Sequence, residues 1–313
     1  MHLAPTTRKR RRARRLSILA GVPLLAAGLT TVVLGQADAA TTPAAAAAGP
    51  ALFDDFRYSS ASDANLRSHG WTLRNGGGGP GVSGASWSSG NISFPTVDGN
   101  QVLQLKTTTD GSAAGTVNSE ISRSAENALA GTYVARIKFA DKPVSGPNGD
   151  HVVQTFFAIS SVSTCDPSYS EADFSEYLPN GGYGGTATFN SQTSWAGGGS
   201  CRDFVEKDEN RSFDGWHTIM ATISGGHVKY YADGTLLADH SGAYYPRRGM
   251  SIDFNQWIQN LTGHCCAGRV SVWNESVDYV FFAPNQVLTQ AQAVQQVTGY
   301  RNAGQYYVNT AGV

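Results

Sequence analysis

Residues 228–238 read Val228-Lys229-Tyr230-Tyr231-Ala232-Asp233-Gly234-Thr235-Leu236-Leu237-Ala238, so that two apolar runs flank Asp233-Gly234. Aromatic, branched and aliphatic side chains fit a pleated, half-buried strand. Asp-Gly suits the two consecutive positive-φ positions of a type I′ turn, whose twist matches that of the strands beside it. This stretch therefore predicts a β-hairpin and antiparallel pairing.

Alternating or β-branched patterns of the same kind recur through the chain. They predict strands at Gln101–Thr107, Thr132–Phe139, Val152–Ile159, Thr218–Ile223 and Val270–Trp273. The chain has 313 residues, of which 41% are hydrophobic and 15% charged, and these values are typical of a globular protein. The expected fold class is all-β.

A single short helix is expected near the C-terminus. Thr289 and Gln292 have the spacing of a capping box. A helix starting there would place Ala291, Val294 and Val297 on one face, and Gly299 would end it.

Residues 1–39 are typical of a signal peptide. Basic residues fill most of Arg8–Arg15, an apolar run covers Leu16–Leu34, and Ala37-Asp38-Ala39 resembles a cleavage site. The pair Arg14-Arg15 leaves the Sec and twin-arginine routes both open. An uncleaved anchor is the alternative, because the apolar run is nearly long enough to cross a bilayer. We expect cleavage and a secreted, extracellular protein.

The remaining chain is expected to consist of an Ala/Pro-rich linker at residues 40–50 and one domain at residues 51–313. No later apolar segment is long enough to span a membrane. Removing residues 1–39 takes away seven of 23 basic residues and one of 24 acidic residues, which leaves a net charge of −7. Nucleic acid and anionic membranes are therefore excluded as expected partners, because both require basic patches. We expect a monomer that binds a neutral ligand.

Four cysteines in an exported chain are expected to form disulfides. Three connectivities are open, because Cys165, Cys201, Cys265 and Cys266 can pair in any combination. We prefer Cys165–Cys201, which would hold together the two ends of the segment between them. A redox role is disfavoured, because the chain has no Cys-x-x-Cys spacing.

Three acidic residues, Glu171, Asp173 and Glu176, fall within six positions. On a regular strand, Glu171 and Asp173 point to one face and Glu176 points to the other. A bulge of one residue near Phe174-Ser175 would bring all three carboxylates to the same face.

Such a face is unfavourable for stability, because neighbouring carboxylates repel one another and raise one another's pKa. Retaining glycoside hydrolysis requires it: Glu171 would be the nucleophile, Glu176 the acid and then the base, and Asp173 a hydrogen-bonding partner between them. The alternatives are a solvated acidic strand or carboxylates gathered for Ca²⁺. Serine-hydrolase, zinc-protease and P-loop motifs do not occur in the chain.

The hexamer Glu171–Glu176 resembles the Glu-x-Asp-x-x-Glu signature of glycoside hydrolase family 16. Similarity to that family extends over six further segments: Phe53–Phe56, Gly131–Lys138, Gly215–Thr218, Val228–Gly234, Met250–Trp257 and Val277–Val280. The resemblance implies a β-jelly-roll sandwich of the concanavalin A-like type, with a concave sheet that forms a substrate cleft. It also implies retaining endo-hydrolysis of a β-linked polysaccharide, as in laminarinases and lichenases, with no required cofactor. A structural calcium ion is compatible with such a family, but no ligand set is readable in the sequence.

Two positions depart from the pattern of the family. Ala172 replaces a larger aliphatic residue, so looser packing behind Glu171 is expected. Val134 replaces an acidic residue and leaves the assignment to a substrate open.

Alternation within Met250–Trp257 places Asp253, Asn255 and Trp257 on the face opposite the core. We expect Asn255 to bind sugar hydroxyls and Trp257 to stack on a sugar ring, although packing in the core is the alternative for Trp257. Trp195 and Tyr183, which lie near the hairpin after Glu176, are further candidate sugar platforms.

Three other functions are open on such a sandwich. A noncatalytic carbohydrate-binding module would not need two carboxylates at attack distance. A transglycosylase would use a sugar hydroxyl in place of water, a difference that the sequence does not reveal. A polysaccharide lyase is disfavoured, because no basic residue is expected in the cleft to neutralise a uronate. The expected reaction is hydrolysis, and the expected substrate is of the β-glucan type.

Overall fold

The structure is a computed structural model that describes residues 49–181, 186–197 and 201–313. The expected signal peptide and most of the linker lie outside this range. The first strand begins at Leu52, directly after the expected start of the domain at residue 51. In the described residues, no helix is both long and apolar enough to cross a membrane.

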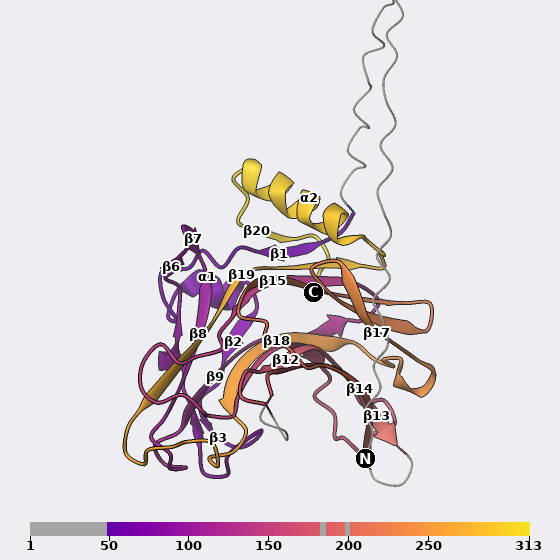
Figure 1. Ribbon diagram of the computed structural model, residues 1–313. Helices are drawn as coiled ribbons and strands as arrows, with labels where there is room; N and C mark the ends of the chain where they lie inside the picture. Colours follow the sequence, from indigo (N-terminus) through magenta and orange to yellow (C-terminus); the bar gives the residue numbers. More distant parts are fainter. Residues whose placement is uncertain (1–48, 182–185, 198–200) are drawn as a thin grey trace, which may run out of the picture. The chain divides into compact units, whose positions relative to one another are not determined.

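Two antiparallel sheets pack face to face (Figure 1), so the predicted all-β fold class is confirmed. Sheet A contains β17 (Thr235–Ser241), β16 (His227–Ala232), β15 (Gly215–Ser224), β10 (Gly131–Phe139) and β19 (Ser271–Pro284) in spatial order. The far edge of β19 pairs with β8 (Leu103–Thr109) and β1 (Leu52–Asp54), which in turn pair with β5 (Ile92–Ser93) and β20 (Tyr307–Asn309).

Sheet B contains β14 (Cys201–Glu209), β13 (Thr188–Gly197), β12 (Ser170–Leu178), β11 (Val152–Ile159), β18 (Met250–Ile258), β9 (Val117–Ala128) and β2 (Trp71–Leu73) in spatial order. Strand β9 also pairs with β8 and, in parallel orientation, with β4 (Ser86–Trp87), and these pairings join the two sheets along one side.

The remaining elements are short. They are β3 (Gly76–Gly77), the pair β6 (Thr96–Val97) and β7 (Asn100–Gln101), the helix α1 (Ala64–Ser68), the 3₁₀ turns Ser89–Asn91 and Gly242–Tyr244, and the C-terminal helix α2 (Gln290–Asn302).

The predicted hairpin joins β16 to β17. Ala232 lies opposite Thr235, and both residues between them, Asp233 and Gly234, have positive φ values of 49° and 79°. The type I′ prediction is confirmed, since both central positions of that turn require positive φ.

Aromatic side chains from both sheets fill the space between them. Tyr133 of β10 lies 4.8 Å from Phe174 of β12 and 4.4 Å from Phe282 of β19, measured between ring centroids. Phe156 of β11 stacks on Phe254 of β18 at 4.8 Å. Burial of each such ring stabilises the fold by about 1.5–3 kcal/mol. Sheet B therefore presents one face to this core and leaves the other face free for a site.

Helix α2 covers the outer face of sheet A, as Figure 1 shows. The capping box of Thr289 and Gln292 is confirmed. The predicted apolar face of the helix is wrong in part, because Ala291 is exposed, whereas Ala293 and Val297 are buried. The predicted end at Gly299 is also wrong, because the helix continues to Asn302. Packing against sheet A selects the buried face, and tertiary contacts override the weak helix propensity of a single glycine.

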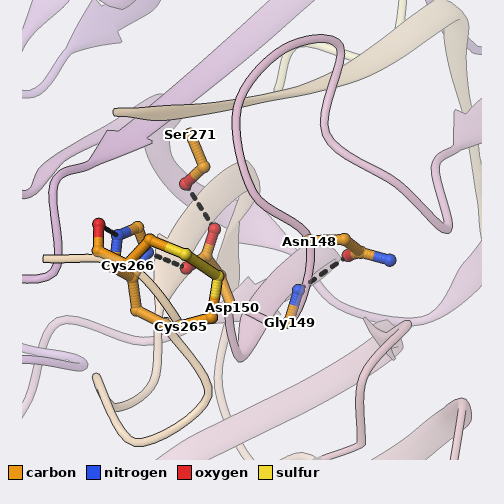
Figure 2. Close-up of a disulfide and its surroundings, with 7 residues drawn as sticks. Asn148, Gly149, Asp150, Cys265, Cys266 and Ser271 are labelled. Atoms are coloured by element: carbon orange, nitrogen blue, oxygen red, sulfur yellow. Dashed lines mark hydrogen bonds and ion pairs between the residues drawn. A yellow bond between two sulfur atoms is a disulfide. The ribbon is translucent and has the colours of Figure 1, made fainter. Parts of the chain in front are cut away.

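Cys165 and Cys201 form a disulfide, as preferred from the sequence, and Cys265 is bonded to its neighbour Cys266. Figure 2 shows the second disulfide beside Asp150, a buried carboxylate. Asp150 accepts hydrogen bonds from Ser271, from Trp273 Nε1 at 2.7 Å and from His264 Nδ1 at 2.6 Å. These bonds fasten the loop after β18 to the start of β19.

Candidate active site

Strand β12 directs Glu171, Asp173 and Glu176 to the face of sheet B that points away from the core. On the neighbouring strand β11, Phe156 lies opposite Ser175 and the next residue, Phe157, lies opposite Asp173. Phe174 is therefore an extra residue in the ladder, and its ring is buried in the core. The predicted bulge is confirmed, and it brings the three carboxylates to one face.

These carboxylates lie in a cleft of about 1090 Å³. Strands β9, β11, β12, β13, β14 and β18 of sheet B contribute side chains to its walls. The volume is of the size that holds several sugar units or a drug-sized ligand.

Glu171 accepts two hydrogen bonds at the same oxygen. Tyr169 donates its hydroxyl to Oε2 at 2.7 Å, and Arg202 of β14 donates from Nε to Oε2 at 3.0 Å. Among the described residues, Oε1 accepts no hydrogen bond. The carboxylate is thus held in one orientation, with Oε1 available to a ligand.

Asp173 is buried, with 4% of its surface exposed, and accepts a hydrogen bond from Gln192 Nε2 at 3.0 Å. Burial, followed by the charges of Glu171 and Glu176, raises the pKa of Asp173 well above its usual range.

The environment of Glu176 also favours the protonated form. Burial is the largest effect and the negative charge of Glu171 the next, and together they raise its pKa to about 7. Two carboxyl groups on one strand therefore have different surroundings: Glu171 faces an arginine, whereas Glu176 is partly buried beside other carboxylates.

Comparison with known proteins places this geometry on a known scaffold. No protein-family model and no curated protein matches the chain. Several solved structures do match it. A Bacteroides ovatus glycoside hydrolase family 16 protein from a mixed-linkage glucan locus, solved with an oligosaccharide product, has a TM-score of 0.57 at 16% identity, covering 74% of this chain and 99% of its own.

Two further structures agree. The Bacillus licheniformis β-glucanase has a TM-score of 0.56 at 17% identity, covering 76% of this chain and 99% of its own. The LamA catalytic domain of Zobellia galactanivorans has a TM-score of 0.55 at 14% identity, covering 75% and 97%. The chain has the family 16 glycoside hydrolase fold. At these identities the comparisons establish the fold alone.

Within the family 16 fold, the structure places Asn255 and Trp257 in the cleft. Trp257 is partly exposed there. Asn255 is buried and already engaged: its amide donates to Glu120 Oε2 at 3.1 Å, and its side-chain oxygen accepts from Thr155 Oγ1 at 2.6 Å. Asn255 thus supports the cleft wall, and a sugar hydroxyl would have to share its donors and acceptors.

Trp195 does not line the cleft. It follows Gln192 on β13 by three positions and therefore points to the opposite face, where it lies against Tyr244 and under the guanidinium of Arg247. The expectation of a sugar platform at Trp195 is wrong, since the residue parity along β13 was not known from the sequence. Tyr183 lies outside the described residues.

Strand β14 supplies cleft residues that sequence reasoning missed: Arg202, Phe204, Glu206 and Asp208. Their alternation in the sequence was a detectable signal of a strand with one shared face. The cleft also contains Arg74, which forms an ion pair with Glu120 at 3.1 Å. The expectation that the cleft lacks basic residues is therefore wrong, although both arginines are already paired with glutamates.

Both positions that depart from the pattern of the family are buried, and neither lines the cleft. Val134 is fully buried on the outer face of sheet A, in the cluster that includes Ala293 and Val297 of α2. It lies on the far side of the sandwich from the cleft, so its side chain does not contact a ligand bound there. Ala172 is fully buried in the core behind the cleft.

A metal site is not recognisable in the part of the chain that the structure describes. No group of three or more His, Cys, Asp or Glu side chains there is arranged to hold an ion. The calcium ion expected to be compatible with the family 16 fold therefore has no identified ligand set.

Proposed function

We propose that the chain is a secreted member of glycoside hydrolase family 16 that cleaves internal bonds of a β-glucan with retention. The observation that carries the proposal is the pair Glu171 and Glu176, which share one face of β12 inside a cleft but differ in their surroundings. The family 16 fold, shared with proteins described as glucanases, supports the choice of substrate.

In the first step, Glu171 attacks the anomeric carbon while the bond from that carbon to the leaving sugar oxygen breaks. Glu176 gives its proton to that oxygen, so the leaving sugar departs as a neutral alcohol. A pKa near 7 suits this role, because Glu176 then still carries its proton in mildly acidic solution.

In the second step, Glu176 is a carboxylate and takes a proton from water as the water oxygen attacks the anomeric carbon. The bond to Glu171 breaks, and the configuration of the starting sugar is restored. Hydrolysis of this kind requires no cofactor. Burial and the charges of Glu171 and Glu176 raise the pKa of Asp173, which favours its protonated form and limits the negative charge on this face of β12.

Neutral glycans fit this cleft better than anionic ones. Carboxylates outnumber arginines along its walls, and the two arginines are paired with Glu120 and Glu171. A lyase would need a free cation to neutralise a uronate, so we do not propose that activity. Trp257 and Phe204, the latter 45% exposed, offer apolar faces on which sugar rings can stack.

Product release from a panel of β-glucans and β-galactans tests the proposal, with the anomeric configuration followed by NMR and Glu171→Gln as the control. The proposal requires β-configured oligosaccharides as the first products and no release by the variant. Retention of glycans on affinity gels without any product would instead favour a carbohydrate-binding module. Products of transfer to added sugar acceptors in place of hydrolysis would favour a transglycosylase.

A further inference from the structure

The edge strand β14 brings charges of opposite sign to the two ends of the acidic face of β12. Arg202 lies at one end, 3.0 Å from the carboxylate of Glu171. Glu206 and Asp208 lie toward the other end, where β14 faces Asn190 of β13. The order of charges along β14 therefore corresponds to the order of the two glutamates along β12.

The contacts of Asn190 hold the acidic end together. Asn190 lies directly opposite Glu176 on one side and directly opposite Asp208 on the other. Its amide donates to Asp208 Oδ1 at 2.8 Å and to Glu206 Oε2 at 3.1 Å. Strand β14 lies two strand spacings, roughly 10 Å, from β12, and the charges of Glu206 and Asp208 both raise the pKa of Glu176.

Protection of a sheet edge does not explain this arrangement. Edge strands commonly carry charges that prevent pairing with other chains. On β14, Asp203 and Lys207 already supply exposed charges, and neither lines the cleft. The charged residues of β14 that line the cleft are instead Arg202, Glu206 and Asp208.

We propose that β14 supplies opposite charges to the two catalytic carboxyl groups: Arg202 is the counter-charge of Glu171, whereas Glu206 and Asp208 add to the effects that favour the protonated form of Glu176. The catalytic roles in this statement rest on the proposed function. The three residues of β14 are positioning residues, since they act through the charges of Glu171 and Glu176.

Burial and the charge of Glu171 raise the pKa of Glu176 more than any residue of β14, and the acidic residues of β14 add to these effects. On β12 itself, the carboxyl groups of Glu171 and Asp173 interact electrostatically with that of Glu176. On β11, the residue opposite Glu176 is Thr155, which is uncharged. The positive charge of Arg202 lowers the pKa of Glu176, whereas Glu206 and Asp208 raise it. The remaining cleft carboxylates, Glu120 and Asp253, lie on β9 and β18, which do not pair with β12.

Titration of the side-chain carboxyl carbons by ¹³C NMR tests the proposal without relying on activity. The full chain is labelled at glutamate, and the signals of Glu171 and Glu176 are assigned by their loss in the corresponding Gln variants. In Glu206→Gln/Asp208→Asn, the titration midpoint of Glu176 should fall by about half a pH unit or more. In Arg202→Gln, the midpoint of Glu176 should rise, because the positive charge of Arg202 lowers the pKa of Glu176.

Asp203→Asn is the matched control, because it removes one negative charge from the same strand without touching the cleft; its Glu176 midpoint should equal that of the wild type. An unchanged Glu176 midpoint in the double variant, or an equal shift in the control, would overturn the proposal. The single variants Glu206→Gln and Asp208→Asn give the same test if the double variant does not fold. If the midpoints shift as predicted but the protein hydrolyses no glycan, this inference is supported and the proposed function is rejected.

Discussion

The ring of Phe174 packs against that of Tyr133 across the sandwich, with centroids 4.8 Å apart. Phe174 is the extra residue of the β12 bulge, and Tyr133 belongs to the opposite sheet. The residue that breaks the regular ladder is thus anchored in the core. This anchor ties the orientation of the three carboxylates to the packing of the whole domain.

Replacing Phe174 by alanine should therefore lower the free energy of unfolding by about 3–5 kcal/mol, because it opens a cavity in a close-packed core. Chemical denaturation measures the loss. Phe204→Ala is the control: Phe204 is exposed, so the change in stability should stay within about 0.5 kcal/mol, while glycan binding weakens. Equal stability losses in the two variants would contradict the anchoring role.

Glu171→Gln should reduce turnover by at least about a thousandfold, since an amide cannot act as the nucleophile. The side chain keeps its shape, so the melting temperature and the affinity for oligosaccharides should remain close to those of the wild type. Product release and affinity electrophoresis check both parts. Wild-type turnover in this variant would remove Glu171 from the mechanism.

Glu176→Ala should lower hydrolysis strongly, and added azide should restore part of the turnover of an aryl β-glycoside, whose leaving group departs without a proton from Glu176. Azide is a small anion that can attack the glycosyl-enzyme without a general base, and the product is a β-glycosyl azide. The measurement is product identity by NMR over a range of azide concentrations, with Glu171→Gln as the variant that azide should not restore to a β-product. Unimpaired rates without azide would assign the acid role to another residue.

The pH dependence of kcat/KM should fall on the basic side with a midpoint of about 7. Glu176 must be protonated to donate to the leaving oxygen, and its pKa is raised to about 7, so activity is present below that pH and is lost above it. Initial rates on a soluble β-glucan at constant ionic strength provide the profile. A basic limb that begins near the ordinary glutamate value would show that Glu176 is not the acid.

Removing the disulfide with Cys165→Ala/Cys201→Ala should cost about 3–4 kcal/mol of stability, because the bridge closes a loop with a sequence separation of 36. The variant Cys265→Ala/Cys266→Ala is the comparison; its bridge joins neighbouring residues and closes almost no loop, so we expect a smaller loss. Thermal unfolding of both variants decides between these expectations. Activity should also fall in the first variant, since Cys201 directly precedes Arg202.

Local patterns in the sequence were sufficient for the acidic face and for part of the elements. Period-two alternation identified several strands but not β9, β13 or β14, the Asp233-Gly234 pair identified a type I′ hairpin, and Thr289 with Gln292 identified the start of α2. The parity argument also predicted the bulge at Phe174. All of these depend on residues a few positions apart, whose geometry the backbone itself determines.

Only the tertiary structure revealed which strands lie next to each other and in what register. It brought Arg202 to Glu171 across 31 positions, turned Trp195 away from the cleft and placed Val134 beneath α2. A local pattern assigns a side chain to one face of its own strand, but the partner of that face depends on long-range pairing and packing of both sheets. The three carboxylates were therefore predictable from the sequence, whereas the charges that surround them required the fold.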